Sequence, residues 1–208
     1  MAETTAAKEK SSRKEEHHHH PEELKEEKPA QTAIPIPINA PLAKSTYCHV
    51  SFTNLKCEML DRKYGKFERC YIRAVNRTHK YIDVYAKLFK IPIDNISIQL
   101  EPMHYNNGYK PFLLGMKFDA CKYLSNPRLR SMLFVRELHA TIANVSNMNH
   151  TCPYNHDLVV DKMWTGNLEK GFLKYLPVPN GDYAIYGKWY TYNIPRANVN
   201  VYFKITNK

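Results

Sequence analysis

Four side chains in one segment carry groups that could do chemistry: His150, Cys152, His156 and Asp157. A cysteine thiolate beside an imidazole is the nucleophile and base of a Cys–His hydrolase. This chemistry needs a free thiol, whereas we expect Cys152 to form a disulfide. The chain also has no G-x-S-x-G elbow, phosphate-binding glycine loop or H-E-x-x-H motif, and only seven glycines. We therefore predict that the protein is not an enzyme and needs no cofactor.

The five cysteines have a spacing that suits long-range disulfides. No C-x-x-C pair and no histidine at zinc-finger spacing accompanies them, so we expect no structural zinc. Cys48, at the edge of a linker, is the expected unpaired thiol. The other four leave three connectivities open, and we favour Cys57–Cys70 with Cys121–Cys152, because each pair flanks one local excursion of the chain. The alternative is a cytosolic protein with five reduced, buried cysteines.

Four N-x-S/T sequons indicate the secretory route and predict glycosylation at Asn76, Asn95, Asn144 and Asn149. Asn76 falls in a predicted turn, Asn144 and Asn149 in a predicted loop, and Asn95 at the start of a predicted strand. Residues 1–14 contain no continuous apolar run behind a basic start, so no secretory signal is recognisable there. This absence is the main observation against an extracellular location.

The first 45 residues differ in composition from the rest of the chain. Residues 1–30 are highly charged and have no apolar period, so they cannot offset the entropy of ordering. Residues 31–43 alternate isoleucine with proline, which favours an extended linker. We interpret the four histidines at 17–20 as part of a solvated tract and predict no metal site. Residues 1–45 are thus expected to be a disordered tail and linker, and residues 46–208 a single domain.

The net charge of +10 comes from the body of the chain, where basic residues are scattered. Residues such as Arg69, Arg73 and Lys87 stand singly at alternate strand positions, and not in blocks that would follow a phosphate backbone. We interpret them as a solvated face and predict no nucleic-acid partner, with an anionic partner as the alternative. No stretch reaches the apolar length of a transmembrane helix.

From His49 onward, apolar residues recur mainly at every second position, which is typical of strands with one buried face. The clearest case is a long hairpin with its turn at 76–79, whose apolar face is formed by Cys70, Ile72, Ala74, Ile82, Val84, Ala86 and Leu88. The same alternation predicts strands around residues 96–100, 112–118, 158–164, 182–190 and 197–205.

One helix is expected to interrupt these strands. Asn126 and Pro127 suit a helix cap and a first helical position. Apolar residues at helical spacing follow them, namely Leu129, Met132, Leu133 and Ile142. Seven or eight strands with one inserted α-helix close most simply as an all-β, two-sheet antiparallel β-sandwich of immunoglobulin-like type.

Several motifs stand in order along the body of the chain: FTNLKCE (52–58), FERCYIRAVNRT (67–78), NGYKPFLLGMKFDACKYL (107–124), NHTCPYNHDLVVDK (149–162), the turn at 179–183 and residues 197–203. Over about 50–208 they resemble the insect-expanded family of secreted proteins of uncharacterised function that is related to the CheB chemosensory proteins. The resemblance implies an ML-like lipid-recognition sandwich, whose members hold acyl chains or sterols between two sheets. It also implies framework cysteines at Cys57, Cys70, Cys121 and Cys152. Members usually begin with a signal peptide, from which the charged N-terminus departs.

We therefore expect a non-enzymatic extracellular protein that binds a lipid or other small apolar ligand, with a chemosensory role and a membrane receptor as a partner. The candidate ligand-lining residues are Ile82, Val84, Leu88, Ile98, Phe112, Leu114, Met116, Phe118, Val201 and Phe203. The alternative is a glycosylated extracellular protein-interaction module with a solid core and no ligand cavity. It would act through exposed tyrosines and basic residues, namely Tyr71, Arg73, Tyr81, Tyr85 and Lys87.

Overall fold

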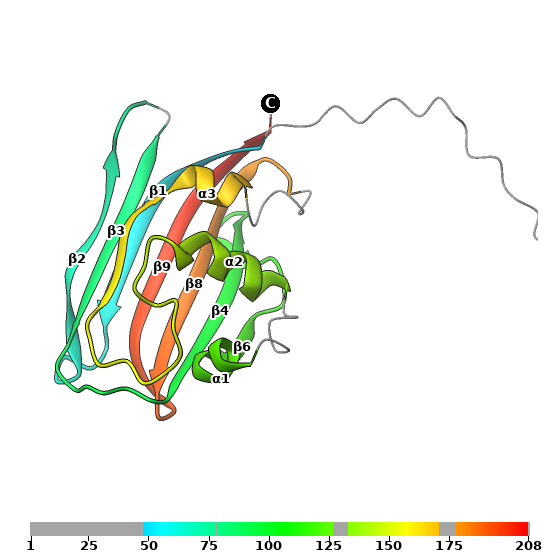
Figure 1. Cartoon of the computed structure of the whole chain (residues 1–208). Helices are drawn as coiled ribbons and strands as arrows, with labels where there is room; N and C mark the ends of the chain where they lie inside the picture. Colours follow the sequence, from blue (N-terminus) through cyan, green and yellow to red (C-terminus); the bar gives the residue numbers. More distant parts are fainter. Residues whose placement is uncertain (1–47, 78, 127–132, 171–177, 208) are drawn as a thin grey trace, which may run out of the picture. The chain divides into compact units, whose positions relative to one another are not determined.

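A computed structural model of the chain describes residues 48–77, 79–126, 133–170 and 178–207 (Figure 1). Residues 43–208 form one compact unit, and all the elements described below belong to it. The predicted tail and linker, residues 1–45, lie outside the described residues.

The larger sheet is antiparallel and contains six strands: β1 (Cys48–Met59), β9 (Ile194–Asn207), β8 (Gly181–Thr191), β4 (Ile96–Tyr105), β5 (Tyr109–Pro111) and β6 (Met116–Asp119). The order across the sheet is β1-β9-β8-β4, and β5 and β6 both pair with β4. The alternating pattern along β9 follows from this placement, because Phe203 and Ile205 are buried while Lys204 between them is exposed.

The smaller sheet contains β2 (Gly65–Ala74), β3 (Lys80–Leu88) and β7 (Leu158–Trp164) in the order β2-β3-β7, again antiparallel. The predicted hairpin is confirmed. Ile72 lies directly opposite Ile82, and Cys70 lies opposite Val84. The strand predicted around 158–164 is confirmed as β7.

Three helices lie among the described residues: α1 (Ala120–Ser125), α2 (Leu133–Ala143) and α3 (Thr165–Lys170). The predicted helix start at Asn126 and Pro127 stands at the edge of a described range, and the description resumes only at Leu133. Asn126 ends α1, and its backbone N–H donates to the carbonyl of Lys122 at 3.0 Å, while the side chain of Asp119 caps the N-terminus of that helix. The predicted helix is confirmed from Leu133, whereas Pro127, Leu129 and Met132 lie outside the described residues.

The predicted strand at 112–118 is wrong in its first half. The backbone N–H of Phe112 donates to the carbonyl of Pro102 at 2.9 Å, after which the chain leaves the sheet until β6 begins at Met116. Leu114 is 90% exposed as a result. Apolar residues still alternate in the sequence through 112–115, but the backbone there does not pair with a neighbouring strand. Without that pairing, the alternating side chains do not form a buried face.

The two sheets share one hydrophobic core, which confirms an all-β sandwich. Phe52 and Phe203 of the larger sheet pack in the same buried cluster as Ile82 and Met163 of the smaller sheet. A disulfide between Cys57 of β1 and Cys70 of β2 ties the sheets together. Helix α2 lies over the face of the larger sheet formed by β8, β9 and β4 (Figure 1). Among the described residues, no helix has the length and apolar character needed to cross a membrane.

Candidate functional site

A cavity of about 200 Å³ lies between the two sheets. β3 and β7 of the smaller sheet form one wall, and β8 and β9 of the larger sheet form the opposite wall. Apolar side chains make up nearly all of its lining, with Ile82 and Val84 facing Ile185 and Val201. This lining arises because both strand pairs turn their apolar alternate residues towards each other.

A second cavity of about 110 Å³ adjoins the first and lies under α2. Its distinct wall includes Phe118, Tyr123 and Val135, which come from β6, α1 and α2. The two cavities share the lining residues Ile96, Leu100, Leu138, Ile142, Met148, Leu158 and Trp189. The two cavities are therefore neighbours, and these side chains lie between them.

Most of the predicted lining residues lie on these walls. The larger cavity is lined by Ile82, Val84, Leu88, Val201 and Phe203, and the smaller by Ile98 and Phe118. Met116 packs partly buried against the main core. Phe112 lines a separate recess of about 30 Å³ at the sheet edge. Leu114 was predicted wrongly, since it is exposed to solvent in the segment between β5 and β6.

Sequence reasoning missed the contribution of α2 and of two residues near the β8–β9 turn. Val135, Leu138 and Ile142 lie on one face of α2 at helical spacing and point into the cavities. Trp189 lines both cavities and Arg196 the larger one. The helical period of α2 was a readable signal, whereas nothing around Arg196 in the sequence marks it as a wall residue.

Four residues that carry polar groups, Tyr64, Tyr190, Thr191 and Arg196, also line the larger cavity, but nearly all of the surface that the wall presents is apolar. The guanidinium of Arg196 forms an ion pair through Nη1 with Oδ2 of Asp61, and its side chain is 14% exposed. The charged group of Arg196 is thus engaged by Asp61, and the cavity wall is almost entirely apolar.

Residues 144–157, between α2 and β7, cover part of the two cavities and are called the cover segment. Met148 of this segment lines both cavities, and Tyr154 lines the smaller one. Two β-bridges hold the segment, one between Ile93 and Tyr154 and one between Ser146 and Val160. The cover segment is otherwise irregular, so side chains supply much of what holds it.

Asn147 is the main side-chain anchor of the cover segment. Its Nδ2 donates to the carbonyl of Asp157 at 2.7 Å, and its Oδ1 accepts from the backbone N–H of Val159 at 2.9 Å. The same Nδ2 lies 3.0 Å from Nδ1 of His156. The Nε2 atoms of His150 and His156 are 2.8 Å apart, so one imidazole donates to the other.

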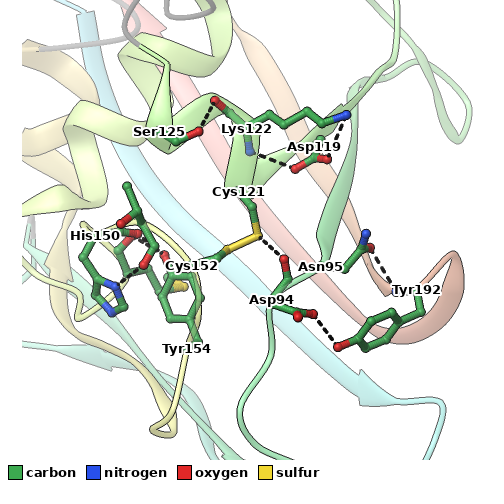
Figure 2. Close-up of a disulfide and its surroundings, with 12 residues drawn as sticks. Asp94, Asn95, Asp119, Cys121, Lys122, Ser125, His150, Cys152, Tyr154 and Tyr192 are labelled. Atoms are coloured by element: carbon green, nitrogen blue, oxygen red, sulfur yellow. Dashed lines mark hydrogen bonds and ion pairs between the residues drawn. A yellow bond between two sulfur atoms is a disulfide. The ribbon is translucent and has the colours of Figure 1, made fainter.

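The disulfide Cys121–Cys152 joins α1 to the cover segment (Figure 2). Tyr154 lies beside it, and its hydroxyl is 2.8 Å from the carbonyl oxygens of both Met148 and His150, to which it donates. Burial raises the pKa of Tyr154 to about 12. Its hydroxyl therefore stays protonated as a donor across the neutral range.

Both predicted disulfides are confirmed, and Cys48 is the free cysteine. Because the sulfur of Cys152 is bonded to Cys121, the segment with His150, His156 and Asp157 holds no thiol nucleophile. Among the described residues, no three metal-ligating side chains gather into one group.

Asp157 closes the cover segment against β3. Its carboxylate accepts from the backbone N–H of Leu88 at 2.8 Å and from the hydroxyl of Tyr85 at 2.6 Å. These two hydrogen bonds hold the pKa of Asp157 below its ordinary value, the Leu88 bond being the larger cause. The same contact raises the pKa of Tyr85.

The four sequon asparagines Asn76, Asn95, Asn144 and Asn149 are all exposed. Asn76 lies in the β2–β3 turn, Asn95 directly before β4, and the other two in the cover segment. The side-chain Oδ1 of Asn95 accepts from the backbone N–H of Tyr192 at 3.1 Å (Figure 2). Glycosylation itself stays a prediction.

Comparison with protein families gives one match. The family model described as a protein of unknown function (DUF1091) matches residues 95–185, from the residue before β4 to the middle of β8. This range contains α1, α2, the cover segment and the disulfide Cys121–Cys152, and it is shorter than the range of about 50–208 suggested by the sequence motifs. No curated protein matches the chain.

Proposed function

We propose that the protein binds a lipid or another small apolar ligand in the two neighbouring cavities and acts without catalysing a reaction. The observation that carries this proposal is the apolar lining that both sheets, α2 and the cover segment contribute to these cavities. Ligand sites are typically concave, mostly apolar and equipped with few polar groups, as here. Apolar cavities of about 150 Å³ in other proteins stay dry and take up small apolar molecules.

The energetic reason is the removal of apolar surface from water. Each square ångström of apolar ligand surface that enters such a space contributes roughly 25 cal/mol. Because the walls are formed by regular strands on both sides, the space is largely preformed and little protein has to be ordered on binding. Trp189 and Met148 divide the two cavities, so their rotamers decide how far a ligand extends.

The proposed location is extracellular, with a membrane receptor as a partner and a chemosensory role. Two disulfides support it, because disulfides persist in oxidising compartments, and the exposed sequons are accessible to glycosylation. The chemosensory role and the CheB relation rest on the resemblance of the sequence motifs, and the matched family model has no assigned activity.

The alternative function, a protein-interaction module, has its own supporting feature on β2 and β3 of the smaller sheet. Arg73 stacks over the ring of Tyr71 at 5.6 Å, and Arg69 over Tyr85 at 5.4 Å. Tyrosine and arginine are enriched at protein interfaces. This surface would act on a protein partner whether or not a ligand occupies the cavities.

Native mass spectrometry of the chain from a eukaryotic secretory host tests the proposal. We expect an apolar adduct that is lost on denaturation. Val201→Phe, which places a ring in the larger cavity, should weaken binding of an apolar fluorescent probe about ten-fold. Val75→Phe is the matched control, since Val75 is 67% exposed and far from the lining. Unchanged binding by Val201→Phe, or no binding by the parent chain, would favour the interaction module.

A further inference from the structure

The imidazoles of His150 and His156 form a pair in the cover segment that the proposed function does not use. Their Nε2 atoms are 2.8 Å apart, and their ring centres are 5.1 Å apart. Both rings also contact the ring of Tyr154, with 4.3 and 5.7 Å between the ring centres. Tyr154 is buried on the wall of the smaller cavity, so a movement of the two histidines acts directly on that wall.

The hydrogen bonds around this pair determine where its protons lie. Nδ1 of His150 is 2.7 Å from the carbonyl oxygen of Thr151, so this nitrogen carries a hydrogen and donates it. In the neutral ring Nε2 of His150 is then an acceptor, and Nε2 of His156 donates to it. Nδ1 of His156 accepts from Nδ2 of Asn147, whose second hydrogen goes to the carbonyl of Asp157. All of these contacts are satisfied while both rings are neutral.

The pair can take up one further proton in this geometry, but not two. The first occupies Nδ1 of His156, which is 2.8 Å from the carbonyl oxygen of Asp157 and can donate to it. A second proton would put a hydrogen on each of the facing Nε2 atoms, and a separation of 2.8 Å holds only one. It would also bring two positive rings together. The rings therefore have to separate before both are charged.

The charged groups that face the pair do not remove this conflict. Asp157 is the acidic neighbour of His156, but hydrogen bonds from Leu88 and Tyr85 of β3 already engage its carboxylate and are the main reason for its low pKa. Lys87 of β3 and then His156 lower that pKa further. Lys87 adds a positive charge on this side of the pair, which disfavours the second proton.

We propose that the pair of His150 and His156 is a pH-sensitive switch, which holds the cover segment closed near neutral pH and opens it in acid. The separated rings bind two protons and the paired rings bind one, so the open state gains population as the pH falls. Imidazoles take up their protons in the range from about pH 8 to about pH 5, and the switch works in that range.

The opening reaches the smaller cavity through Tyr154. Its hydroxyl, which stays uncharged because burial raises its pKa to about 12, donates to the carbonyl of His150 at 2.8 Å. A displaced His150 removes this acceptor and loosens the wall, while the disulfide keeps Cys152 attached to α1 in both states (Figure 2). A bound ligand is thus retained near neutral pH and released in acid. This release, unlike the opening itself, rests on the proposed ligand-binding function.

Hydrogen exchange of the full chain at about pH 7.5 and about pH 5 tests the opening, after correction for the exchange of an unstructured chain at each pH. We expect opening of residues 144–157 to become about ten-fold more frequent for each pH unit once the second proton binds, because opening takes up one proton. Exchange in β8 and β9 should not change with pH after the same correction.

Three glutamine variants assign the effect to the pair. His150→Gln keeps an oxygen that can accept from Nε2 of His156 but cannot be protonated, so the opening in acid should disappear. His156→Gln removes the other ring and should have the same result. His79→Gln is the matched control and should open as the parent chain does. Its imidazole lies in the β2–β3 turn and stacks on Trp164, which ends β7, whereas the cover segment precedes the start of that strand.

Release is measured with N-phenyl-1-naphthylamine as the probe, by stopped-flow fluorescence after a jump from about pH 7.5 to about pH 5. Dissociation of the probe should become at least ten-fold faster in the parent chain and in His79→Gln. It should stay slow in His150→Gln.

The outcomes separate this inference from the proposed function. Cover exchange that is equal at the two pH values in the parent chain, or that keeps its pH dependence in both His150→Gln and His156→Gln, shows that the switch does not exist. Probe release that does not accelerate although the cover opens refutes the control of release while ligand binding stands. If the probe binds at neither pH, the proposed function fails, and the exchange data alone decide whether the pair opens the cover.

Discussion

The two disulfides hold two different kinds of structure. Cys57–Cys70 joins β1 to β2, and both cysteines stand within backbone ladders, opposite Val199 and Val84 respectively. Cys121–Cys152 joins the six-residue helix α1 to the irregular cover segment. The first crosslink lies among the paired strands of the two sheets, which form the cavity walls and are called the frame. The second attaches the cover segment to α1.

This difference teaches which part of the site is held redundantly. Each strand of the frame has backbone hydrogen bonds to a neighbour along most of its length. The cover segment depends on two β-bridges, one disulfide and the side chains of Asn147, Tyr154 and Asp157. Regions with few backbone bonds open at lower free energy than the core, so ligand entry is expected through the cover.

Removal of each disulfide should cause the largest losses of unfolding free energy, and it tests most directly whether the frame and the cover segment differ. The double variant Cys121→Ser with Cys152→Ser should lose about 4 kcal/mol of unfolding free energy, and Cys57→Ser with Cys70→Ser about 3 kcal/mol, because the former closes the longer loop. Denaturant unfolding measures both. Ligand dissociation, followed by stopped-flow fluorescence, should accelerate in the first variant and hardly change in the second. Equal acceleration in both would remove the distinction between frame and cover.

Asn147→Ala should have an intermediate effect confined to the cover. It removes the hydrogen bonds to Asp157 and Val159, for an expected loss of about 1 kcal/mol per bond or less. Hydrogen exchange should rise in residues 144–157 and stay unchanged in β8 and β9. Asn155→Ala is the control, since Asn155 is an exposed residue of the same segment. Faster exchange throughout β8 and β9 would show that the frame depends on the cover.

Acidification should produce the smallest effect, through Asp157. Its pKa is lowered in the folded protein, so its contribution to stability is present above its unfolded pKa of about 3.9 and is lost as the pH falls through the lower folded value. The difference in unfolding free energy between the parent chain and Asp157→Asn should therefore be constant near neutral pH and shrink below about pH 4. A difference that is the same at about pH 3 and at neutral pH would contradict this assignment.

Unfolding at alkaline pH tests the same hydrogen bond between Tyr85 and Asp157 from the side of the tyrosine. The hydrogen bond to Asp157 raises the pKa of Tyr85 above its ordinary value of about 10. Its contribution is present below that value and is lost as the pH rises through the higher folded pKa. Tyr85→Phe should remove only the share of the alkaline dependence that Tyr85 contributes, and it should leave most of the acid dependence of Asp157, because the Leu88 N–H still donates to its carboxylate.

The sequence predicted the frame better than the cover for a physical reason. The alternation of apolar residues in the sequence of β3 and β9 is a local pattern, and it placed Val84 and Val201 on facing walls. Backbone pairing is not local, so the same alternation wrongly extended a strand through Leu114. Asn126 ends α1, a short helix that the apolar spacing in the sequence did not indicate.

The ion pair between Arg196 and Asp61 could not be predicted from the sequence for a related reason. Arg196 and Asp61 are separated by 135 residues, and their pairing depends on the Leu60 and Asp61 backbone meeting the start of β9. The disulfides were easier to predict, because only three pairings of four cysteines exist. A long-range contact could thus be predicted where few pairings were possible, and not where many residues could serve as the partner.

The unpaired Cys48 carries a thiol that could exchange with the two disulfides. Burial, and secondly the carboxylate of Glu169, raise the pKa of its thiol. Exchange between a thiol and a disulfide proceeds through the thiolate, so a thiol that rarely ionises attacks slowly. Once β1 and α3 have packed, the odd sulfur is a poor nucleophile towards Cys57–Cys70 and Cys121–Cys152. The two disulfides are then protected from exchange, because the thiol of Cys48 reacts slowly.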